Sequence, residues 1–545
     1  MVLSKRTARS TILPGKVTFL LVSGLGPFRS YSEYLAGTPL GTDYPDSAEL
    51  QQTYARLLGG PLDLKRLHYT RNGAAEPLLR QRSYREPCLS SMTMRSILEG
   101  EGIDYDAIEI EDLWYESAEP PRRHYDVVGL STTFLCRGKH VRKVIRWIRD
   151  RFPEAKLVVG GQFSNLKYAM LLSEHPDVDY IIRGDAEAAL PMLLRALDGR
   201  ATLDDVPNLV ARDEGGSPRM NRFEYIDIEA HPSPRFQGRH LSVPYESMRG
   251  CPFTCKYCSF PAASPTWRYK SAEKIVGDWK SYVEQNGAGL IAALDSTFTV
   301  PPVRLKRVLE LLSQTRIPWY AFSRANNIKD RETVTQLEAS SCRGLSIGFE
   351  SMNDATLKAM DKKVTAGENR RAFDLLDQSE VLVNGSFMIG YPSETPEAYE
   401  VTHNFLVREL RGRFGLSVFS VVDETMPVWQ EAAKYQLEET DDGWRHCGMD
   451  QATASKLQAR TMLDVRWNND DAVMLTWQFD YATPIAQGFG VRGNRRVEKL
   501  VDRLTFLVRD WGTGDEAERR GRAALSELES LGVRQLEPET SHHSG

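Results

Sequence analysis

The sequence lacks a long apolar run. No stretch approaches the roughly 20 apolar residues that a transmembrane helix needs, and no apolar stretch of the signal-peptide type follows the basic N-terminus. A total of 69 lysine and arginine residues against 74 aspartate and glutamate residues leaves a net charge of only −5. This balance gives no reason to expect a nucleic-acid or membrane partner. We therefore expect a cytoplasmic protein with neither of these partners.

Cysteine is also scarce. The chain has 7 cysteines in 545 residues, which is too few for a disulfide framework. Four of them are scattered and are expected to be buried or half-buried thiols: Cys88, Cys136, Cys342 and Cys447. The other three stand together as Cys251, Cys255 and Cys258, with a Cys-x3-Cys-x2-Cys spacing. These three are the candidate metal ligands.

Three thiolates in one tight loop suit an iron–sulfur cluster. Four cysteines would close the site, whereas three leave one iron open to an outside ligand. A structural zinc loop is the alternative, but zinc commonly takes two separated Cys or His pairs, and no second pair follows here. The spacing, with Tyr257 before the last cysteine, resembles the signature of the radical S-adenosylmethionine (SAM) enzymes. The resemblance implies that Cys251, Cys255 and Cys258 hold a catalytic [4Fe-4S] cluster whose open iron binds SAM.

The N-terminal third alternates short apolar runs with helix patterns. The runs predict buried parallel strands at residues 17–22, 104–110, 125–133, 155–161 and 178–184. This alternation predicts an α/β fold with a doubly wound, Rossmann-like sheet, which binds its ligand at the carboxyl ends of the strands. Hydroxyl groups and bare backbone at these ends suit an amide-rich cofactor or a dinucleotide. The candidates are Ser131, Thr132, Thr133, Gly160, Gly161, Gly184 and Glu187.

Because this domain precedes the cysteine motif, it resembles the cobalamin-binding domain of class B radical SAM methyltransferases. The resemblance implies that these strand ends contact cobalamin, carried as methylcobalamin. Many cobalamin proteins supply a histidine to cobalt from an Asp-x-His-x-x-Gly loop after the first strand. The corresponding loop here begins Ser23-Gly-Leu-Gly and has no histidine. We expect cobalamin without a protein histidine ligand, with His68 and His140 as the open alternatives.

Six further strands are expected in the middle third, at residues 241–248, 289–295, 318–324, 343–350, 381–390 and 416–421. This number suits the open (β/α)6 barrel of the radical SAM fold, whose site lies at the carboxyl strand ends. The resemblance implies SAM contacts there. Asp295 stands where the family has its amine-binding Gly-Gly-Glu, Ser323 and Arg324 would contact ribose and carboxylate, Glu350 would contact ribose, and Gly390 lies in the adenine-binding strand pattern. Each polar residue has an alternative role as a strand-end cap or salt-bridge partner.

The domain boundaries predicted from composition are as follows: a cobalamin-binding domain at 1–205, a linker at 206–240, the partial barrel at 241–425, a small C-terminal cap domain at 426–536 and a disordered tail at 537–545. The cap is expected to determine the substrate.

Segments of the second half resemble the phosphinothricin-type P-methyltransferase branch: residues 294–304, 348–354, 360–363 and 443–450. This resemblance implies methylation of a P–H centre in a phosphinate antibiotic precursor of the N-acetyl-demethylphosphinothricin type. Carbon methylation, such as that of tryptophan C2, is the alternative. Arg324 and Arg445 are basic residues suited to a phosphinate or a carboxylate.

The family chemistry implies two methyl transfers. Cob(I)alamin takes a methyl group from one SAM, a second SAM gives a 5′-deoxyadenosyl radical, and the resulting substrate radical takes the methyl group from cobalt. A small-molecule substrate and a low-potential electron donor of the flavodoxin or ferredoxin type are then required. A tRNA-modifying enzyme would carry further cluster cysteines and a basic RNA-binding domain, neither of which is visible. A cobalamin sensor would leave the cysteine loop unused.

Overall fold

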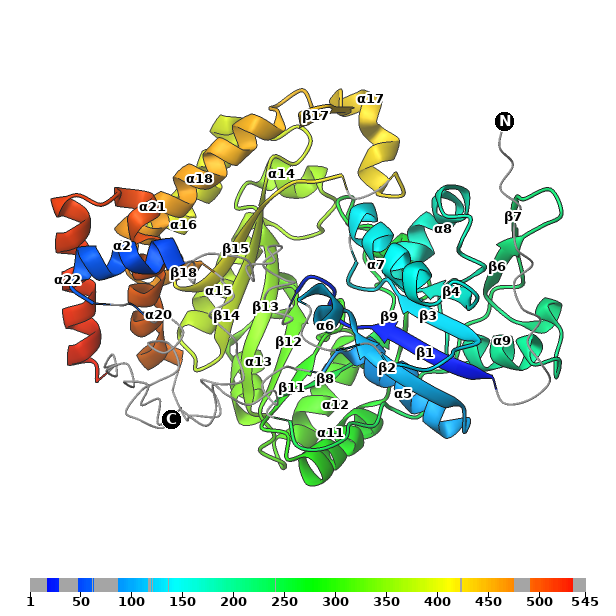
Figure 1. Cartoon of the computed structure of the whole chain (residues 1–545). Coiled ribbons are helices and arrows are strands. Elements are labelled where there is room, and N and C mark those ends of the chain that lie inside the picture. The colour runs from blue at the N-terminus through cyan, green and yellow to red at the C-terminus, as the bar shows by residue number, and fades with distance from the viewer. Residues whose placement is uncertain are drawn as a thin grey trace, which may run out of the picture.

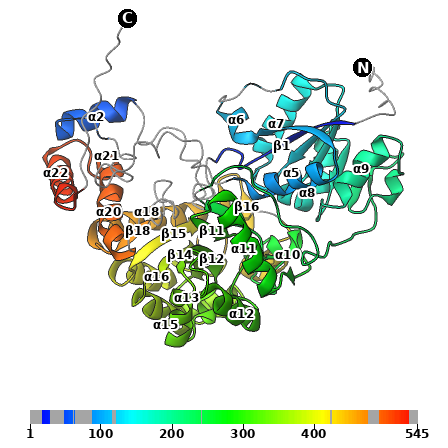
Figure 2. The same cartoon turned by 90° about the horizontal axis from the view of Figure 1, so that it is seen from below.

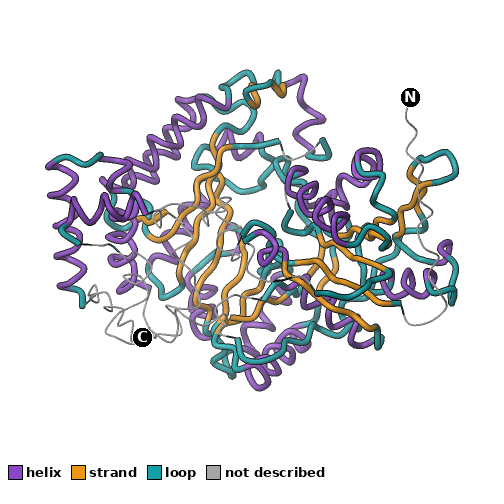
Figure 3. The backbone as a smooth tube through the Cα atoms, in the orientation of Figure 1, coloured by secondary structure: helices purple, strands orange, loops and turns teal. Residues whose placement is uncertain are grey.

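The computed structural model describes residues 17–28, 48–60, 62, 87–115, 119, 121–135, 137–240, 242–421, 424–474 and 491–532. Two sheets organise this part of the chain, with helices around them (Figures 1 and 3). No described helix is both long enough and apolar enough to cross a bilayer. The predicted tail at 537–545, Cys136 and His68 lie outside the described residues.

The first sheet has the strand order β2-β1-β3-β4-β5-β6-β7 within the described ranges. Its strands are β1 (Thr18–Ser23), β2 (Asp104–Glu109), β3 (Val127–Ser131), β4 (Lys156–Gly160), β5 (Tyr180–Ile182), β6 (Leu209–Arg212) and β7 (Pro218–Met220). Strands β1 to β5 pair in parallel, and β6 and β7 are added antiparallel. The predicted doubly wound parallel sheet is confirmed. The order reverses between β1 and β3, which is where such sheets bind ligands.

Helices cover both faces of this sheet. They are α5 (Leu89–Gly100), α6 (Ile110–Trp114), α7 (Gly138–Arg151), α8 (Gln162–Glu174) and α9 (Ala189–Leu197). Successive residues of a strand point to opposite faces, so β1 supplies two cores. Leu20 and Val22 pack in the core that includes α7, whereas Phe19 and Leu21 pack in the core that includes α9. This burial on both sides explains the continuous apolar run of the strand.

The second sheet is open, with the order β18-β15-β14-β13-β12-β11-β8 in the described part of the chain. Its strands are β8 (Ser242–Tyr245), β11 (Leu290–Ala293), β12 (Trp319–Ser323), β13 (Cys342–Glu350), β14 (Leu382–Ile389), β15 (Gly412–Val418) and β18 (Ala472–Met474), all paired in parallel. The first six correspond to the predicted partial barrel. Strand β15 begins before the predicted residue 416 because Arg413 is buried against Glu498, a partner that the local sequence does not reveal.

Helices alternate with these strands: α10 (Phe260–Ala263), α11 (Ala272–Asn286), α12 (Pro302–Leu312), α13 (Arg331–Ala339), α14 (Asp354–Ala359), α15 (Ala366–Asp377), α16 (Pro396–Arg408), α17 (Ala432–Tyr435) and α18 (Gln451–Asn468). Two short antiparallel ribbons pair β9 (Met248–Arg249) with β10 (Arg268–Tyr269) and β16 (Glu438–Thr440) with β17 (Gly443–Arg445).

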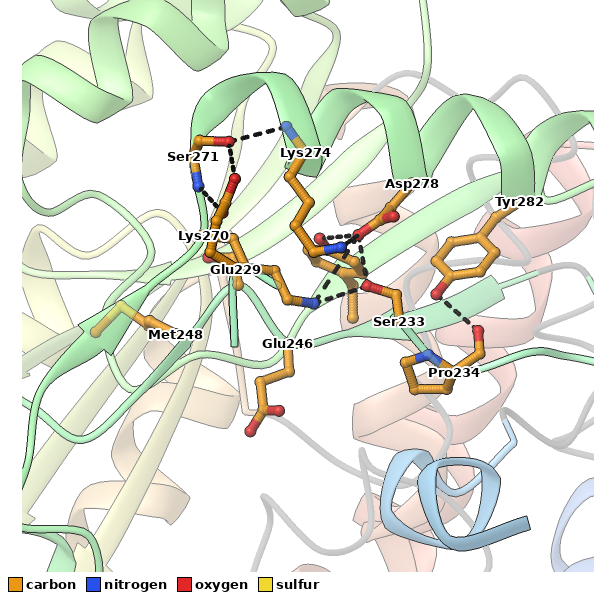
Figure 4. A network of polar contacts seen from close by, with 12 residues as sticks. Glu229, Ser233, Pro234, Glu246, Met248, Lys270, Ser271, Lys274, Asp278 and Tyr282 are labelled. Atoms are coloured by element: carbon orange, nitrogen blue, oxygen red, sulfur yellow. Dashed lines mark hydrogen bonds and ion pairs between the residues drawn. The ribbon is translucent and has the colours of Figure 1, made fainter. Parts of the chain in front are cut away.

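The segment 206–240 is not the simple linker predicted from its proline and charge content. It contains β6 and β7, because Leu209 and Val210 are buried apolar residues that extend the first sheet. Its later part is fastened to α11 (Figure 4). Ser233 donates a hydrogen bond to Asp278 at 2.5 Å, and Tyr282 donates to the Pro234 carbonyl at 2.9 Å. These contacts join the two sheets through an ordered connection.

The ends of the chain also depart from the predicted domains. Strand β18, from the predicted cap, extends the barrel sheet. The helices α20 (Val491–Thr505), α21 (Leu507–Trp511) and α22 (Asp515–Ser530) follow it, and α2 (Ala48–Leu58) lies beside them (Figures 1 and 2). Tyr54 donates a hydrogen bond to the Leu504 carbonyl at 2.5 Å. Helix α2 therefore belongs with the C-terminal helices and not with the predicted domain at 1–205.

Candidate functional site

The three motif cysteines lie on a loop that follows β9, at the carboxyl ends of the second sheet. Cys255 is buried, and Cys251 and Cys258 are partly exposed. Gly250 opens the loop with φ +78°, and a Cβ there would lie 2.5 Å from the Thr266 carbonyl oxygen. Only glycine avoids that clash. Among the described residues no three His, Cys, Asp or Glu side chains converge on one metal ion. A [4Fe-4S] cluster does not require such convergence, because each iron that the protein holds takes one cysteine sulfur.

Segments distant in the sequence hold this loop in place. The Lys256 backbone N–H donates to the Met360 carbonyl at 2.9 Å, and its carbonyl accepts from the Val428 N–H at 3.0 Å. The Thr254 hydroxyl donates to Asp361 at 2.7 Å. The loop backbone is thereby fixed from two sides. The residues 360–363 that suggested a family branch act here as supports for the loop.

Glu350 ends β13 in a positive-φ conformation of +63°. Its Oε1 accepts from the Tyr257 hydroxyl and from Lys362 Nζ, both at 2.9 Å. Burial raises the pKa of Tyr257 well above its usual range, and the charge of Glu350 adds to that rise. The residue predicted to contact ribose is therefore also a partner of the cysteine loop through Tyr257.

Ser323 and Arg324 end β12 and are buried. The Ser323 hydroxyl pairs with the Thr299 hydroxyl at 2.9 Å. Arg324 points at the cysteine loop, where its NH1 donates to Cys255 Sγ at 3.3 Å. Both side chains thus have partners in the chain, and their predicted contacts with ribose and carboxylate stay predictions.

Asp295 follows β11 and accepts hydrogen bonds from the Ser247 and Met248 backbone N–H groups at 2.7 and 2.9 Å. Burial raises its pKa to about 6, although Arg304 partly offsets the rise. The carboxylate is thus occupied in fixing the start of the cysteine loop. The predicted contact of Asp295 with the SAM amine stays a prediction.

Gly390 follows β14 with φ +82°, and a Cβ there would lie 2.6 Å from Trp444. Its N–H donates to Glu394 at 2.8 Å, and its carbonyl accepts from His446 Nε2 at 3.1 Å. Burial raises the pKa of Glu394 to about 7. The segment 443–450 therefore packs on the end of β14 as part of the fold.

A cavity of about 630 Å³ lies between the carboxyl ends of the two sheets. Six of the seven predicted cobalamin residues line it: Ser131, Thr133, Gly160, Gly161, Gly184 and Glu187. Asp295 and Cys258 line it from the other sheet. Thr132 does not, because its hydroxyl donates to the Gly160 carbonyl at 2.7 Å and accepts from the Ser164 N–H at 3.0 Å. Its role is to join β3 to the start of α8.

The part of the cavity inside the first domain is an apolar slot along the sheet, lined by Phe19, Gly129 and Val158. A Cβ on Gly129 would lie 2.3 Å from the Phe19 ring, so glycine keeps this slot open. At its polar end, Glu187 Oε2 is buried without a hydrogen-bond partner in the described structure. An apolar slot with a free buried acceptor fits cobalamin, which carries a flat nucleotide base and amide donors.

The loop after β1 is fixed by the Leu25 N–H donating to Glu111 at 2.9 Å.

Arg249 connects the two halves of the cavity, a role not anticipated from the sequence. It donates to Asp185 at 2.8 Å, pairs with Glu187 and lies 2.9 Å from Glu246. Arg268 donates to the other Asp185 oxygen at 2.7 Å. Burial alone would raise the pKa of Asp185, but the two guanidinium groups lower it below its usual value. The sequence feature that could have revealed this connecting role is the position of Arg249, two residues before Cys251.

Comparison with known protein families assigns both halves of this site. Residues 90–194 match the B12 binding domain, and residues 245–406 match the radical SAM superfamily. The two matched regions line the cavity from its two sides. The predicted cofactors, namely a [4Fe-4S] cluster, SAM and cobalamin, are those of these two domains and are confirmed.

Solved structures share the fold over almost the whole chain. The radical SAM methyltransferase TsrM from Kitasatospora setae, with cobalamin and a [4Fe-4S] cluster bound, has a TM-score of 0.60 at 16% identity and covers 94% of this chain and 100% of its own. The cobalamin-dependent SAM radical enzyme OxsB with aqua-cobalamin bound has a TM-score of 0.56 at 14% identity, covering 95% of this chain and 76% of its own. The predicted architecture is confirmed by this similarity.

Curated relatives match over shorter regions. The anaerobic magnesium-protoporphyrin IX monomethyl ester cyclase of Cereibacter sphaeroides is 25% identical over 297 residues, which are 50% of this chain and 48% of that protein. The bacteriochlorophyllide d C-12(1)-methyltransferase of Chlorobaculum tepidum is 24% identical over 194 residues, 35% of this chain and 42% of that protein. The chain thus spans about half the length of these relatives.

Proposed function

We propose that this protein is a cobalamin-dependent radical SAM methyltransferase that acts on a small molecule. The observation that carries the proposal is the shared cavity, in which Gly161 and Glu187 of the B12-binding domain face the same space as Cys258 of the cluster loop. A methyl carrier and a radical source must both reach one substrate, and a common cavity allows this. The methyltransferases among the similar proteins support the same reading.

Each group of residues has a distinct task in this proposal. When bound, the cluster supplies an electron to SAM, and cobalamin supplies the methyl group. Cys251, Cys255 and Cys258 would hold the cluster, and Glu187 would accept a hydrogen bond from a cobalamin amide. Arg249 keeps the two domains in register through Asp185 and Glu187. The apolar walls exclude water from the reacting groups.

A phosphinate with a P–H bond is the first candidate substrate, as the sequence segments at 294–304, 348–354, 360–363 and 443–450 suggest. In this case the enzyme methylates the phosphorus atom of a phosphinothricin-type antibiotic precursor. The segment around Asp295 borders the cavity, which supports this candidate. The segment around Trp444 instead packs against Gly390.

Methylation of carbon is the second candidate, and the charges of the site favour it. Arg249 is surrounded by three carboxylates, and Arg324 is directed to Cys255. Arg445 pairs with Glu438 on the surface at 2.7 Å. All three cations are engaged within the chain, which favours a reacting group that needs no cation, such as an indole carbon.

The same proposal includes a low-potential electron donor of the flavodoxin or ferredoxin type. Reduction of the cluster requires such a partner, because each reduction consumes one electron from outside the protein. We also propose a cytoplasmic location, since a reducing compartment protects the free thiols of Cys88 and Cys342.

The test is anaerobic turnover of the protein loaded with iron, sulfide and cobalamin. Deuteromethyl-labelled SAM is supplied with N-acetyl-demethylphosphinothricin or with tryptophan, and mass spectrometry follows the label, S-adenosylhomocysteine and 5′-deoxyadenosine. Label on phosphorus supports the first candidate, and label on carbon supports the second. A variant with alanine at Cys251, Cys255 and Cys258 serves as the control and is expected to transfer no label. Full transfer by that variant would refute the proposal.

A further inference from the structure

Arg324 is a buried cation without a carboxylate partner in the described structure. Its side chain is 5% exposed. NH1 donates to Cys255 Sγ at 3.3 Å, and NH2 donates to the Lys362 carbonyl. The guanidinium lies over the Phe253 ring, 3.8 Å from its centroid. Nε is buried and has no hydrogen-bond partner among the described residues.

Burying a guanidinium without an anion costs free energy, because no interaction in the protein replaces the lost hydration. The nearby cation does not share this problem, since Lys362 is paired with Glu350 at 2.9 Å. That pair is neutral as a whole, so it offers Arg324 no net negative charge. The remaining group that Arg324 contacts is the Cys255 sulfur, which is one of the three proposed cluster ligands. The negative charge of a cluster held by three thiolates is therefore the counter-charge that this burial requires.

We propose that Arg324 is a positioning residue that sets the reduction potential of the cluster through its charged hydrogen bond to Cys255. The inference rests on the cluster being held by the three motif cysteines. One electron from the low-potential donor enters the cluster and adds one negative charge. A hydrogen bond and a positive charge at a ligand sulfur stabilise the reduced form more than the oxidised form, and so raise the potential.

The test is a redox titration of the cluster in the full-length protein, followed by electron paramagnetic resonance without substrate. Arg324→Gln removes the charge and is expected to move the midpoint potential to a more negative value. Arg324→Lys keeps the charge without the planar fork and is expected to lie between Arg324→Gln and the native protein. It also provides a second variant if the glutamine protein does not fold. Iron content is measured in each sample, so that only fully loaded clusters are compared.

Arg307→Gln is the control. Arg307 is an exposed arginine on α12 of the same sheet–helix unit, where it donates to Glu273 at 2.9 Å, and no contact with a cysteine sulfur is described for it. Its replacement is expected to leave the potential unchanged. An unchanged potential in Arg324→Gln, or an equal shift in Arg307→Gln, would overturn the inference. The titration needs no methyl transfer, so it stays decisive even if the proposed methyltransferase activity fails.

Discussion

Gly161 is a residue at which the chain approaches itself closely beside the cavity. It has φ +99° and ψ −178°, a region that is essentially restricted to glycine. A Cβ at this position would lie 2.6 Å from the Thr133 backbone nitrogen. The close approach brings the loop after β3 and the start of α8 together at the wall of the cavity. A single missing side chain therefore shapes the wall where cobalamin is expected to bind.

We predict that Gly161→Ala destabilises the apoprotein by about 1–3 kcal/mol, the range for such backbone strain. Urea unfolding under anaerobic conditions measures this, and gel filtration measures how much added cobalamin the variant retains. Gly160→Ala is the control, because its Cβ would have its nearest neighbour, the Ile182 carbonyl oxygen, at an ordinary 3.8 Å. Equal stability of the two variants would contradict the account.

The sequence could predict which residues lie at the carboxyl ends of the strands, and so which residues lie near the site. The carboxyl ends of parallel strands share one edge, and Ser131, Gly160 and Asp295, which were predicted at strand ends, all line the cavity. The direction of each side chain could not be predicted. Arg324 turns toward Cys255, which is 69 positions earlier in the chain, and no local pattern encodes that partner.

Helix α2 shows that an element can belong to a distant part of the chain. Its buried face packs on α20 and α22, and a Cβ on Gly521 would lie 2.5 Å from a Leu58 methyl group. The small residue at 521 allows the helices to approach closely. The N-terminal segment thus completes the core of the C-terminal helices, which are in turn joined to the barrel through Arg413 and Glu498.

We predict that Leu57→Ala costs about 2–5 kcal/mol in this small core, as is usual for a buried leucine. Hydrogen–deuterium exchange is expected to increase in α20 and α22, while the first sheet keeps its protection. Gln52→Ala changes an exposed position of the same helix and should have no such effect. Equal exchange in the two variants would show that α2 does not support the C-terminal helices.

Strands and helices could be predicted from sequence where their apolar pattern is long. The apolar runs of β1, β3 and β4 fix strands that are buried on both faces. Strands β6, β7 and β18 are only three or four residues long. This length is too short to show the spacing of apolar residues that identifies a strand. Helix α2 could not be assigned to a domain from sequence, since its partners lie more than 400 positions away.

On the scale of the whole molecule, two sheets present their carboxyl ends to one cavity. The contact between them includes a buried ionic cluster, in which Arg249 and Arg268 of the barrel meet Asp185 of the first domain. Removing one member of such a group leaves an uncompensated charge, so the two domains are held in one register. Cobalamin and the cluster would then occupy neighbouring positions in a single space.

This shared space is the central claim, and its most direct test is the magnetic interaction between the two cofactors. The protein is loaded with cob(II)alamin and a reduced cluster, each quantified, and its electron paramagnetic resonance spectrum is compared with those of samples that hold only one of them. The account predicts that the two signals broaden or split when both cofactors are present. A spectrum equal to the sum of the two separate signals, at full occupancy of both, would contradict it.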